Sequence, residues 1–127
     1  MSFIVIEGNA TEDASLREFT SKRTQQSVPI SNVTVAVNDR RYNAETDQWV
    51  DTGRTFYEVT VSGQEAIHFA GTATKGARLL VAGNVYVEEY RDNEGNTRQR
   101  RRINAEHHGL SSKYAPARSP ETVSSGS

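Results

Sequence analysis

The chain has 127 residues with 15 Lys plus Arg and 16 Asp plus Glu, and this length with a formal net charge of −1 fits a single domain. It contains no cysteine, which excludes a disulfide framework, a thiolate zinc site and a cysteine nucleophile. No stretch approaches the roughly 18 apolar residues of a membrane span, and the apolar run 3–6 is too short for a secretory signal, so we expect a cytoplasmic protein without a membrane partner.

Alternation of apolar and polar residues is the main secondary-structure signal. Val plus Ile number 17 against 4 Leu, and β-branched side chains favour strands over helices. Gly83 interrupts one of the alternating stretches, where it predicts a bulge or bend that curls the sheet. Five strands are predicted in chain order, over residues 2–8, 28–38, 55–62, 78–90 and 97–106.

One short helix is predicted between the third and fourth strands, within residues 63–76. Apolar residues recur there at helical spacing, and Gly76 is a natural stop signal. The residues that form this apolar stripe are Ala66, Ile67, Ala70 and Ala73.

The remaining connections are polar. Residues 39–54 are predicted as a long polar loop that contains the only tryptophan, Trp49. Residues 92–96 form a hairpin loop in which Gly95 supplies a positive φ. From residue 116 onward Pro, Ser and Gly dominate, so the chain divides into a domain over 1–115 and a flexible tail over 116–127.

The predicted order is strand, strand, strand, helix, strand, strand. This order matches the OB-fold, a five-stranded Greek-key barrel that commonly binds oligonucleotides or oligosaccharides. We therefore predict an all-β protein with one short helix and an OB-fold architecture.

Strand parity separates a core face from an outer face. If Val59 and Val61 face the core, Phe56 points outward, and if Val85 and Val87 face the core, Tyr86 and Tyr90 point outward. In the last strand Ile103 and Ala105 face inward, which leaves three basic residues on the outer face: Arg98, Arg100 and Arg102. Exposed aromatics beside arginines are what a single-strand binder needs, because bases stack on the rings while cations follow the phosphates.

Two other interpretations of this surface stay open. Exposed aromatics on a barrel also serve as subunit contacts or as a protein-docking surface. The short arginine run is also found on solvated sheet edges, and acidic neighbours such as Glu88 and Glu89 can neutralise part of it.

Catalysis is not expected. His107 and His108 are adjacent on a strand, so their rings point to opposite faces and cannot easily share a metal, and His68 is interpreted as a partly buried helix residue. No nucleophile–base pattern or pair of catalytic carboxylates stands out, and Lys75 lies in a segment without the glycines of a phosphate-binding loop. We predict a protein that is not an enzyme and that has no cofactor and no metal.

Charge is unevenly distributed along the chain. Residues 1–74 carry 6 basic and 10 acidic side chains, whereas residues 75–118 carry 9 basic and 5 acidic ones. The overall near-neutrality therefore does not exclude a nucleic-acid partner, because the local field steers a polyanion more than the net charge does. We expect moderate phosphate attraction, with stacking supplying much of the rest.

Several short motifs, in a fixed order, resemble bacterial single-stranded DNA-binding proteins, the SSB family, and most closely its actinobacterial members. The resemblance covers about residues 4–115. Its main parts are Gly8–Asp13 with Leu16-Arg17, Val33–Asn38 before Arg40-Arg41, Gln48–Asp51, Phe56–Gly63, Thr74–Arg78, Val81–Gly83, Tyr90 with Asn93–Arg98, and Leu110–Ala115.

This resemblance implies an OB-fold that assembles as a homotetramer and wraps single-stranded DNA without sequence preference during replication, repair and recombination. It implies stacking roles for Phe56 and Tyr90, and places Trp49 in a loop that clamps the strand. It further implies basic contacts from Arg40, Arg41, Lys75, Arg78 and Arg91. An RNA-binding or primosome-type module is the alternative within the same broad class.

Three departures from the family pattern stand out. Ser62 lies where many members carry an aromatic residue, and Arg41-Tyr42 stands where a further stacking tryptophan is common, so Tyr42 or Arg41 is expected to substitute for it. Members usually end in an acidic tip that recruits replication and repair proteins, whereas this sequence ends in Val-Ser-Ser-Gly-Ser. A tail-less or phage-type member or a truncated chain would explain this end, and recruitment of such partners is not expected.

Overall fold

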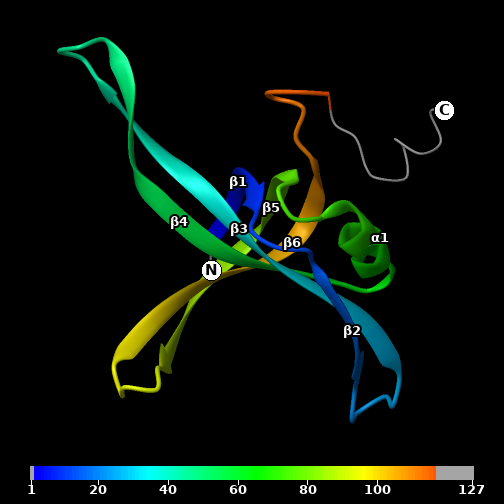
Figure 1. Cartoon of the computed structure of the whole chain (residues 1–127). Coiled ribbons are helices and arrows are strands. Elements are labelled where there is room, and N and C mark those ends of the chain that lie inside the picture. The colour runs from blue at the N-terminus through cyan, green and yellow to red at the C-terminus, as the bar shows by residue number, and fades with distance from the viewer. Residues whose placement is uncertain (1, 117–127) are drawn as a thin grey trace.

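The computed structural model describes residues 2–116, and strands make up most of them (Figure 1). The elements are β1 (Ser2–Ala10), β2 (Ser15–Thr20), β3 (Ser27–Asn43), β4 (Gln48–Ser62), α1 (Gln64–Thr72), β5 (Arg78–Arg91) and β6 (Thr97–Leu110). All five predicted strands and the predicted helix are present in their predicted order, each strand extending further than the sequence pattern indicated.

Five of the strands close into a barrel. The sheet runs β1-β5-β6-β4-β3, and β1 returns to pair with β3 at Asn9↔Ala36 and Ala10↔Val35. The β4–β6 pairing is parallel, whereas the other pairings are antiparallel. This closed Greek-key arrangement is the OB-fold, so the predicted architecture is confirmed.

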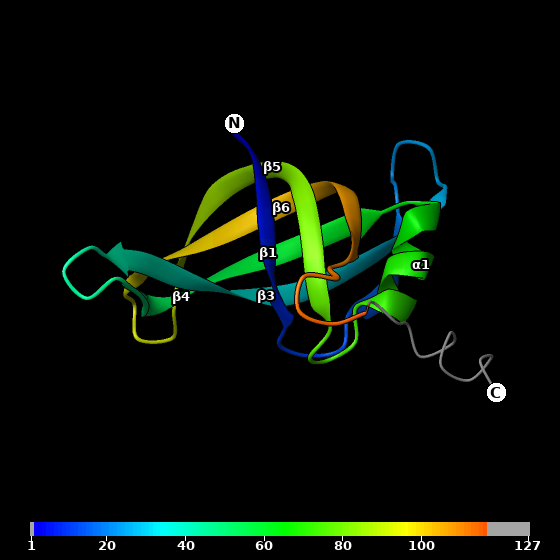
Figure 2. The same ribbon diagram turned by 90° about the horizontal axis from the view of Figure 1, so that it is seen from above.

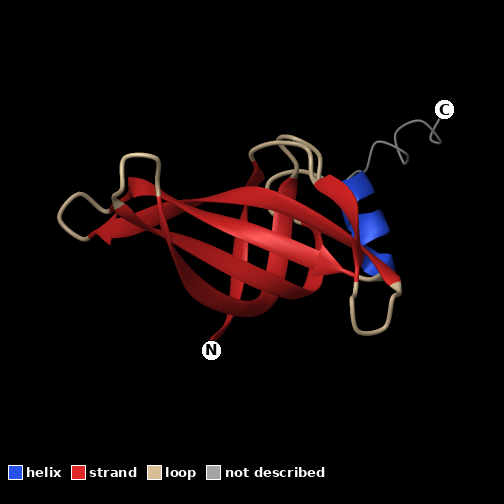
Figure 3. Cartoon of the chain, turned by 90° about the horizontal axis from the view of Figure 1, so that it is seen from below, coloured by secondary structure: helices blue, strands red, loops and turns tan. Residues whose placement is uncertain are grey.

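The core is small and is built from alternate residues of the strands. Val33, Val35, Val59 and Val61 are at most 3% exposed, and Ile103 is fully buried, as strand parity predicted. One end of the barrel is covered by α1, which inserts Phe69 among these side chains (Figure 2). Figure 3 shows the same division, with the strands forming the body and the helix at one end.

A close approach of backbones lets β5 and β6 bend together at Gly83. The β5–β6 register shifts between Ala82 and Gly83, which confirms the predicted bulge. A Cβ at Gly83 would collide with the carbonyl oxygen of Asn104 on β6, so only glycine fits this position without a backbone shift. A Cβ at Gly8 would likewise collide with the carbonyl oxygen of Ala36, next to the pairs that close the barrel.

Two parts of the fold differ from the sequence prediction. The segment 39–54 is not a loop, because β3 and β4 continue as a twisted two-stranded ribbon as far as Asn43↔Gln48, with a register shift at Asp39/Arg40 (Figure 1). The strand β2, which pairs with the first part of β3, was not predicted at all. Both segments are exposed on both faces, so neither carries the apolar alternation by which a strand is recognised.

The sequence analysis placed three side chains in the wrong environment: Val87, Ile67 and His68. Val87 is 55% exposed, because β5 runs on beyond the end of the core. Ile67 is also exposed, since the buried side of α1 consists of Ala66 and Phe69. His68 is exposed, whereas His108 on β6 is partly buried, with its ring 5.1 Å from that of Phe69.

No helix in the part of the chain that the structure describes is long and apolar enough to cross a membrane. The predicted flexible tail over 116–127, including its terminus without an acidic tip, lies outside the described residues apart from Pro116.

We predict that Gly83→Ala lowers the free energy of unfolding by about 1–3 kcal/mol, because the added methyl group is forced against a neighbouring backbone. Gly109→Ala is the matched control, since a Cβ there meets nothing within 4 Å. Chemical denaturation of both variants measures the difference. Equal midpoints for the two would show that the close approach at Gly83 does not constrain the fold.

Candidate nucleic-acid interface

Two hairpin ribbons extend from the barrel and diverge, one formed by the ends of β3 and β4 and the other by the ends of β5 and β6 (Figure 1). Between them lies a hollow of about 360 Å³ lined by side chains from both ribbons. We call it the stacking hollow, because both Phe56 of β4 and Tyr90 of β5 line it. The structure therefore brings together two of the three aromatics to which strand parity gave an outward direction, whereas Tyr86, 37% exposed on β5, does not line the hollow.

The ring of Phe56 is open to solvent. Phe56 is 52% exposed, and its cross-strand partner on β3 is Ala36, whose methyl group covers little of the ring. Tyr90 is 38% exposed, and the guanidinium of Arg100 lies over its ring at 4.4 Å from the centroid. Arg54 and Arg101 also line the hollow, although neither was singled out from the sequence.

The outer face beside the hollow carries a group of four charged side chains, which we call the charge quartet: Glu58, Glu88, Arg100 and Arg102. Glu58 lies 3.2 Å from Arg100 and 3.3 Å from Arg102, and Glu88 lies 3.7 Å and 3.0 Å from the same two arginines. The two arginines are therefore neutralised by carboxylates on neighbouring strands. Strand pairing places this set together, because Arg102 lies opposite Glu58 on β4 and Arg100 lies opposite Glu88 on β5.

The end of the β3–β4 ribbon carries a second aromatic pair. The rings of Tyr42 and Trp49 pack edge to face with centroids 5.5 Å apart, across a direct cross-strand pair. Trp49 is 67% exposed, and the neighbouring Arg41 is also exposed. The Tyr42 hydroxyl donates a hydrogen bond to Asp47, which raises the pKa of Tyr42 and fixes the orientation of its ring.

Of the predicted basic residues, only Arg100 lines the hollow, and Arg98 does not line it although it lies opposite Tyr90. Arg98 forms an ion pair of 2.9 Å with Asp92 within its own hairpin, and this hydrogen bond lowers the pKa of Asp92. Arg91 is exposed at the end of β5, and Lys75 lies in the connection from α1 to β5.

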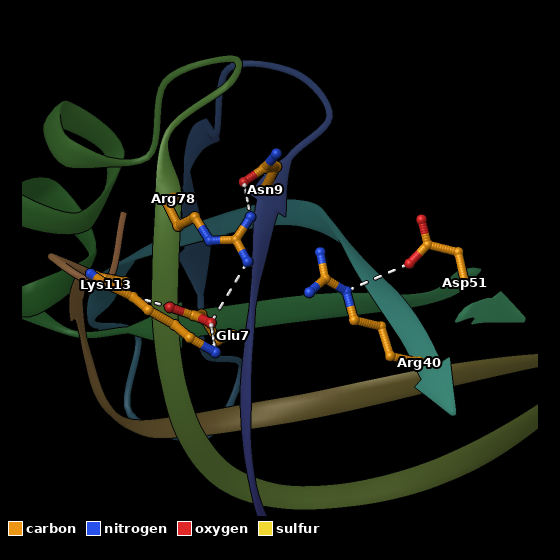
Figure 4. Close-up of polar contacts among 7 residues, drawn as sticks. Glu7, Asn9, Arg40, Asp51, Arg78 and Lys113 are labelled. Carbon is orange, nitrogen blue, oxygen red and sulfur yellow. Dashed lines mark hydrogen bonds and ion pairs between the residues drawn. The ribbon is translucent and has the colours of Figure 1, made fainter. Parts of the chain in front are cut away.

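Arg40 and Arg78 lie on a different wall of the barrel, on either side of β1 (Figure 4). Arg78 donates hydrogen bonds to Asn9 (3.1 Å) and Glu7 (3.4 Å), and Arg40 pairs with Asp51 at 3.3 Å. Glu7 also accepts a hydrogen bond from Ser111, which is the main reason that the pKa of Glu7 is lowered.

The geometry defines a class of protein: a small closed barrel with an open aromatic and cationic surface, suited to an extended polyanion with planar groups. Among residues 2–116, no group of three or more His, Asp or Glu side chains is placed to hold a metal ion.

Comparison with known proteins specifies the class further. The chain belongs to the single-strand binding protein family, whose model matches residues 1–111. It is 30% identical over 123 residues to the single-stranded DNA-binding protein of Paenarthrobacter nicotinovorans, covering 97% of this chain and 69% of that protein. Identity to the protein of the same description from Mycobacterium tuberculosis is also 30%, covering 97% and 72%. The resemblance inferred from the sequence motifs, including its actinobacterial character, is confirmed.

A solved structure supports the fold. The chain is similar to the crystal structure of a small single-stranded DNA-binding protein from Streptomyces coelicolor, with a TM-score of 0.71 and 23% sequence identity, covering 87% of this chain and 94% of that one. This likeness shows that the two chains share the OB-fold.

Proposed function

We propose that this protein binds single-stranded DNA without sequence preference and protects it during replication, repair and recombination, in the cytoplasm at the nucleoid. The observation that carries the proposal is the stacking hollow, where Phe56 and Tyr90 lie beside Arg54 and Arg100. Membership of the single-strand binding protein family and the descriptions of the actinobacterial relatives support it.

Stacking supplies both affinity and tolerance of sequence. A base placed on an aromatic ring contributes about 1–3 kcal/mol whatever its identity, because every base has a π-face. Arg54 and Arg101 are available for the phosphates on either side of such a base, since both line the same hollow. At the end of the β3–β4 ribbon, Trp49 and Tyr42 offer a further platform that reaches away from the barrel.

We predict that Phe56→Ala and Tyr90→Ala each weaken binding of an oligo-dT strand by about 1–3 kcal/mol, through loss of a stacking surface. Fluorescence anisotropy of a labelled oligonucleotide measures the affinity, and light scattering measures the mass of the protein. Phe19→Ala is the matched control, because Phe19 is 57% exposed on β2 and does not line the hollow. A loss of assembly without a loss of affinity per subunit would instead favour the protein-docking interpretation.

The charge quartet has a direct consequence for this binding. Arg100 and Arg102 each pair with Glu58 and Glu88, so a DNA phosphate has to compete with two carboxylates for them. This competition lowers the affinity for DNA and reduces the number of counterions that binding releases from the DNA. Binding therefore stays reversible.

We therefore predict that Glu58→Gln tightens binding several-fold and makes the dependence of log K on log salt steeper by about 0.7 for each additional phosphate that the freed arginines bind. Glu89→Gln is the matched control, because it removes the same charge from a position next to Glu88, on the opposite face of β5. Salt titrations of the two variants give the comparison. If Glu58→Gln binds no better than Glu89→Gln, the carboxylates do not compete with DNA.

The proposal includes assembly as a homotetramer, as the family resemblance implies. Within the described part of the chain, residues 2–8 of β1 pair only with β5, so one backbone edge of β1 is open. Phe3 and Val5 on this strand are 52% and 62% exposed, and Leu80 on β5 is 46% exposed. An open edge beside exposed apolar side chains supports association with a second copy through this strand.

We expect Val5→Glu to reduce the mass in solution below that of four copies, because it places a charge in the apolar contact. Leu16→Glu on β2, where Leu16 is 50% exposed, is the control and is expected to keep the wild-type mass. Sedimentation analysis at one protein concentration distinguishes the two. An unchanged mass for Val5→Glu would show that the β1 surface is not a subunit contact.

A further inference from the structure

A third hairpin, formed by β2 and the first part of β3, extends from the barrel beside α1 (Figure 1). In the six-stranded sheet β2 stands at the end of the strand order and pairs only with β3, so its other backbone edge is open within the described residues. All six residues of β2 are exposed. We call this open edge, together with the side chains of residues 15–20, the β2 edge.

The outer face of the hairpin carries an aromatic side chain next to an arginine. Val33 is buried, so odd-numbered residues of β3 face inward here and even-numbered ones face outward. Phe19 lies opposite Val28, and Arg17 lies opposite Ile30. Because cross-strand partners share a face, both side chains of β2 belong to the outer face, where Phe19 is 57% exposed. A strand added to the β2 edge therefore meets one apolar and one basic neighbour on this face.

The basic charge of this hairpin is unpaired. Arg17 lies on β2, and Lys22 and Arg23 lie in the turn that follows it. None of the three belongs to an ion pair within residues 2–116, whereas the arginines of the charge quartet are paired. Glu18 is the only carboxylate between residues 15 and 28, and it points to the opposite face from Arg17. Charge complementarity therefore calls for an acidic occupant.

A second copy of this chain fits the same edge poorly. Two copies paired antiparallel along β2 are related by a twofold axis, and because paired residues share a face, the residue on the axis lies opposite its own copy. With the axis at the middle of the strand, that residue is Arg17 or Glu18. Like charges directly opposite are destabilising in a sheet, so the edge favours a strand of different sequence.

We propose that the β2 edge is a docking site for an extended acidic segment of another protein, which adds to the sheet as a further strand. Its backbone pairs with the open edge, a carboxylate lies beside Arg17, and an apolar side chain packs on Phe19. Strand addition takes affinity from main-chain hydrogen bonds and specificity from alternate side chains. A DNA strand has no row of N–H and C=O groups to pair with this edge, so the docking site is separate from the stacking hollow.

The probe is a fluorescently labelled octapeptide, Glu-Glu-Thr-Val-Thr-Glu-Val-Thr, whose binding is followed by anisotropy. Paired antiparallel with β2, its first valine lies opposite Phe19 and its third glutamate lies opposite Arg17. We expect the wild type to bind it about 5-fold or more tightly than the same peptide with glutamine in place of glutamate, because opposite charges across a strand pair are stabilising. Failure of the acidic peptide to bind, or equal affinity for the glutamine peptide, overturns the proposal.

Pairing through the backbone is tested on the peptide itself. Only alternate residues of an added antiparallel strand direct their N–H groups to the edge. Two peptides are therefore N-methylated on alternate residues, one on the odd and one on the even positions. We expect one of them to lose binding and the other to keep it. Equal affinities for the two overturn strand addition.

The site on the protein is tested by Arg17→Glu, which is expected to lower the affinity for the acidic peptide about 5-fold or more. Arg91→Glu is the matched control, because Arg91 is exposed at the far end of β5. Equal affinities for the two variants overturn the assignment to the β2 edge. Displacement of the peptide by oligo-dT also overturns it, because the peptide then occupies the nucleic-acid site.

The remaining outcomes separate this inference from the proposed function. If the wild type binds the acidic peptide as described but does not bind oligo-dT, the proposed function fails and the docking site stands. If Leu16→Glu lowers the mass of the protein in solution, a second copy covers the β2 edge and the docking site fails.

Discussion

The structure depends on one constraint. Successive side chains of a strand point to opposite faces, and here the strands close into a very small barrel, so alternate side chains face its interior. Val35, Val59 and Ile103 fill the interior, and no larger side chain than Phe69 is fully buried in the described residues. Side chains on the opposite parity face outward, which is why Phe56 stands exposed three residues before the buried Val59 on β4. Closure of the barrel in turn requires glycine at Gly83, where two backbones come too close for any Cβ. The binding surface is thus a direct result of how the core is filled.

Charge on this surface is arranged in pairs. Arg100 and Arg102 lie within 3.7 Å of two carboxylates, so the arginine run of the sequence is a partly neutralised network. Basic and acidic side chains thus balance one another on this surface as they do in the whole sequence, whose formal net charge is −1. A protein that has to release its strand does not need a strongly positive surface when open rings such as Phe56 supply much of the attraction.

Sequence patterns predicted the barrel and the outward aromatics well, because both follow from strands with one buried face. On β4, for example, Val59 faces the core and Phe56 faces outward. They failed for β2 and for the β3–β4 ribbon, where both faces are exposed and register depends on backbone pairing alone. They also could not show that Arg78 lies beside Tyr114, or that Glu58 pairs with Arg100, since these contacts join segments distant in the chain. The grouping of the predicted basic residues into separate surfaces is therefore information that only the three-dimensional structure provides.

The most direct test of the central claim is a titration of the wild-type protein that follows the fluorescence of Trp49, the only tryptophan, at one salt concentration. Single-stranded DNA, single-stranded RNA and duplex DNA of equal length are compared. We predict quenching and tight binding with single-stranded DNA and, when the titration is repeated at higher salt, a lower affinity; the RNA arm tests the RNA-binding alternative. Equal affinity for duplex DNA would contradict the central claim, because paired bases cannot stack on Phe56 and Tyr90.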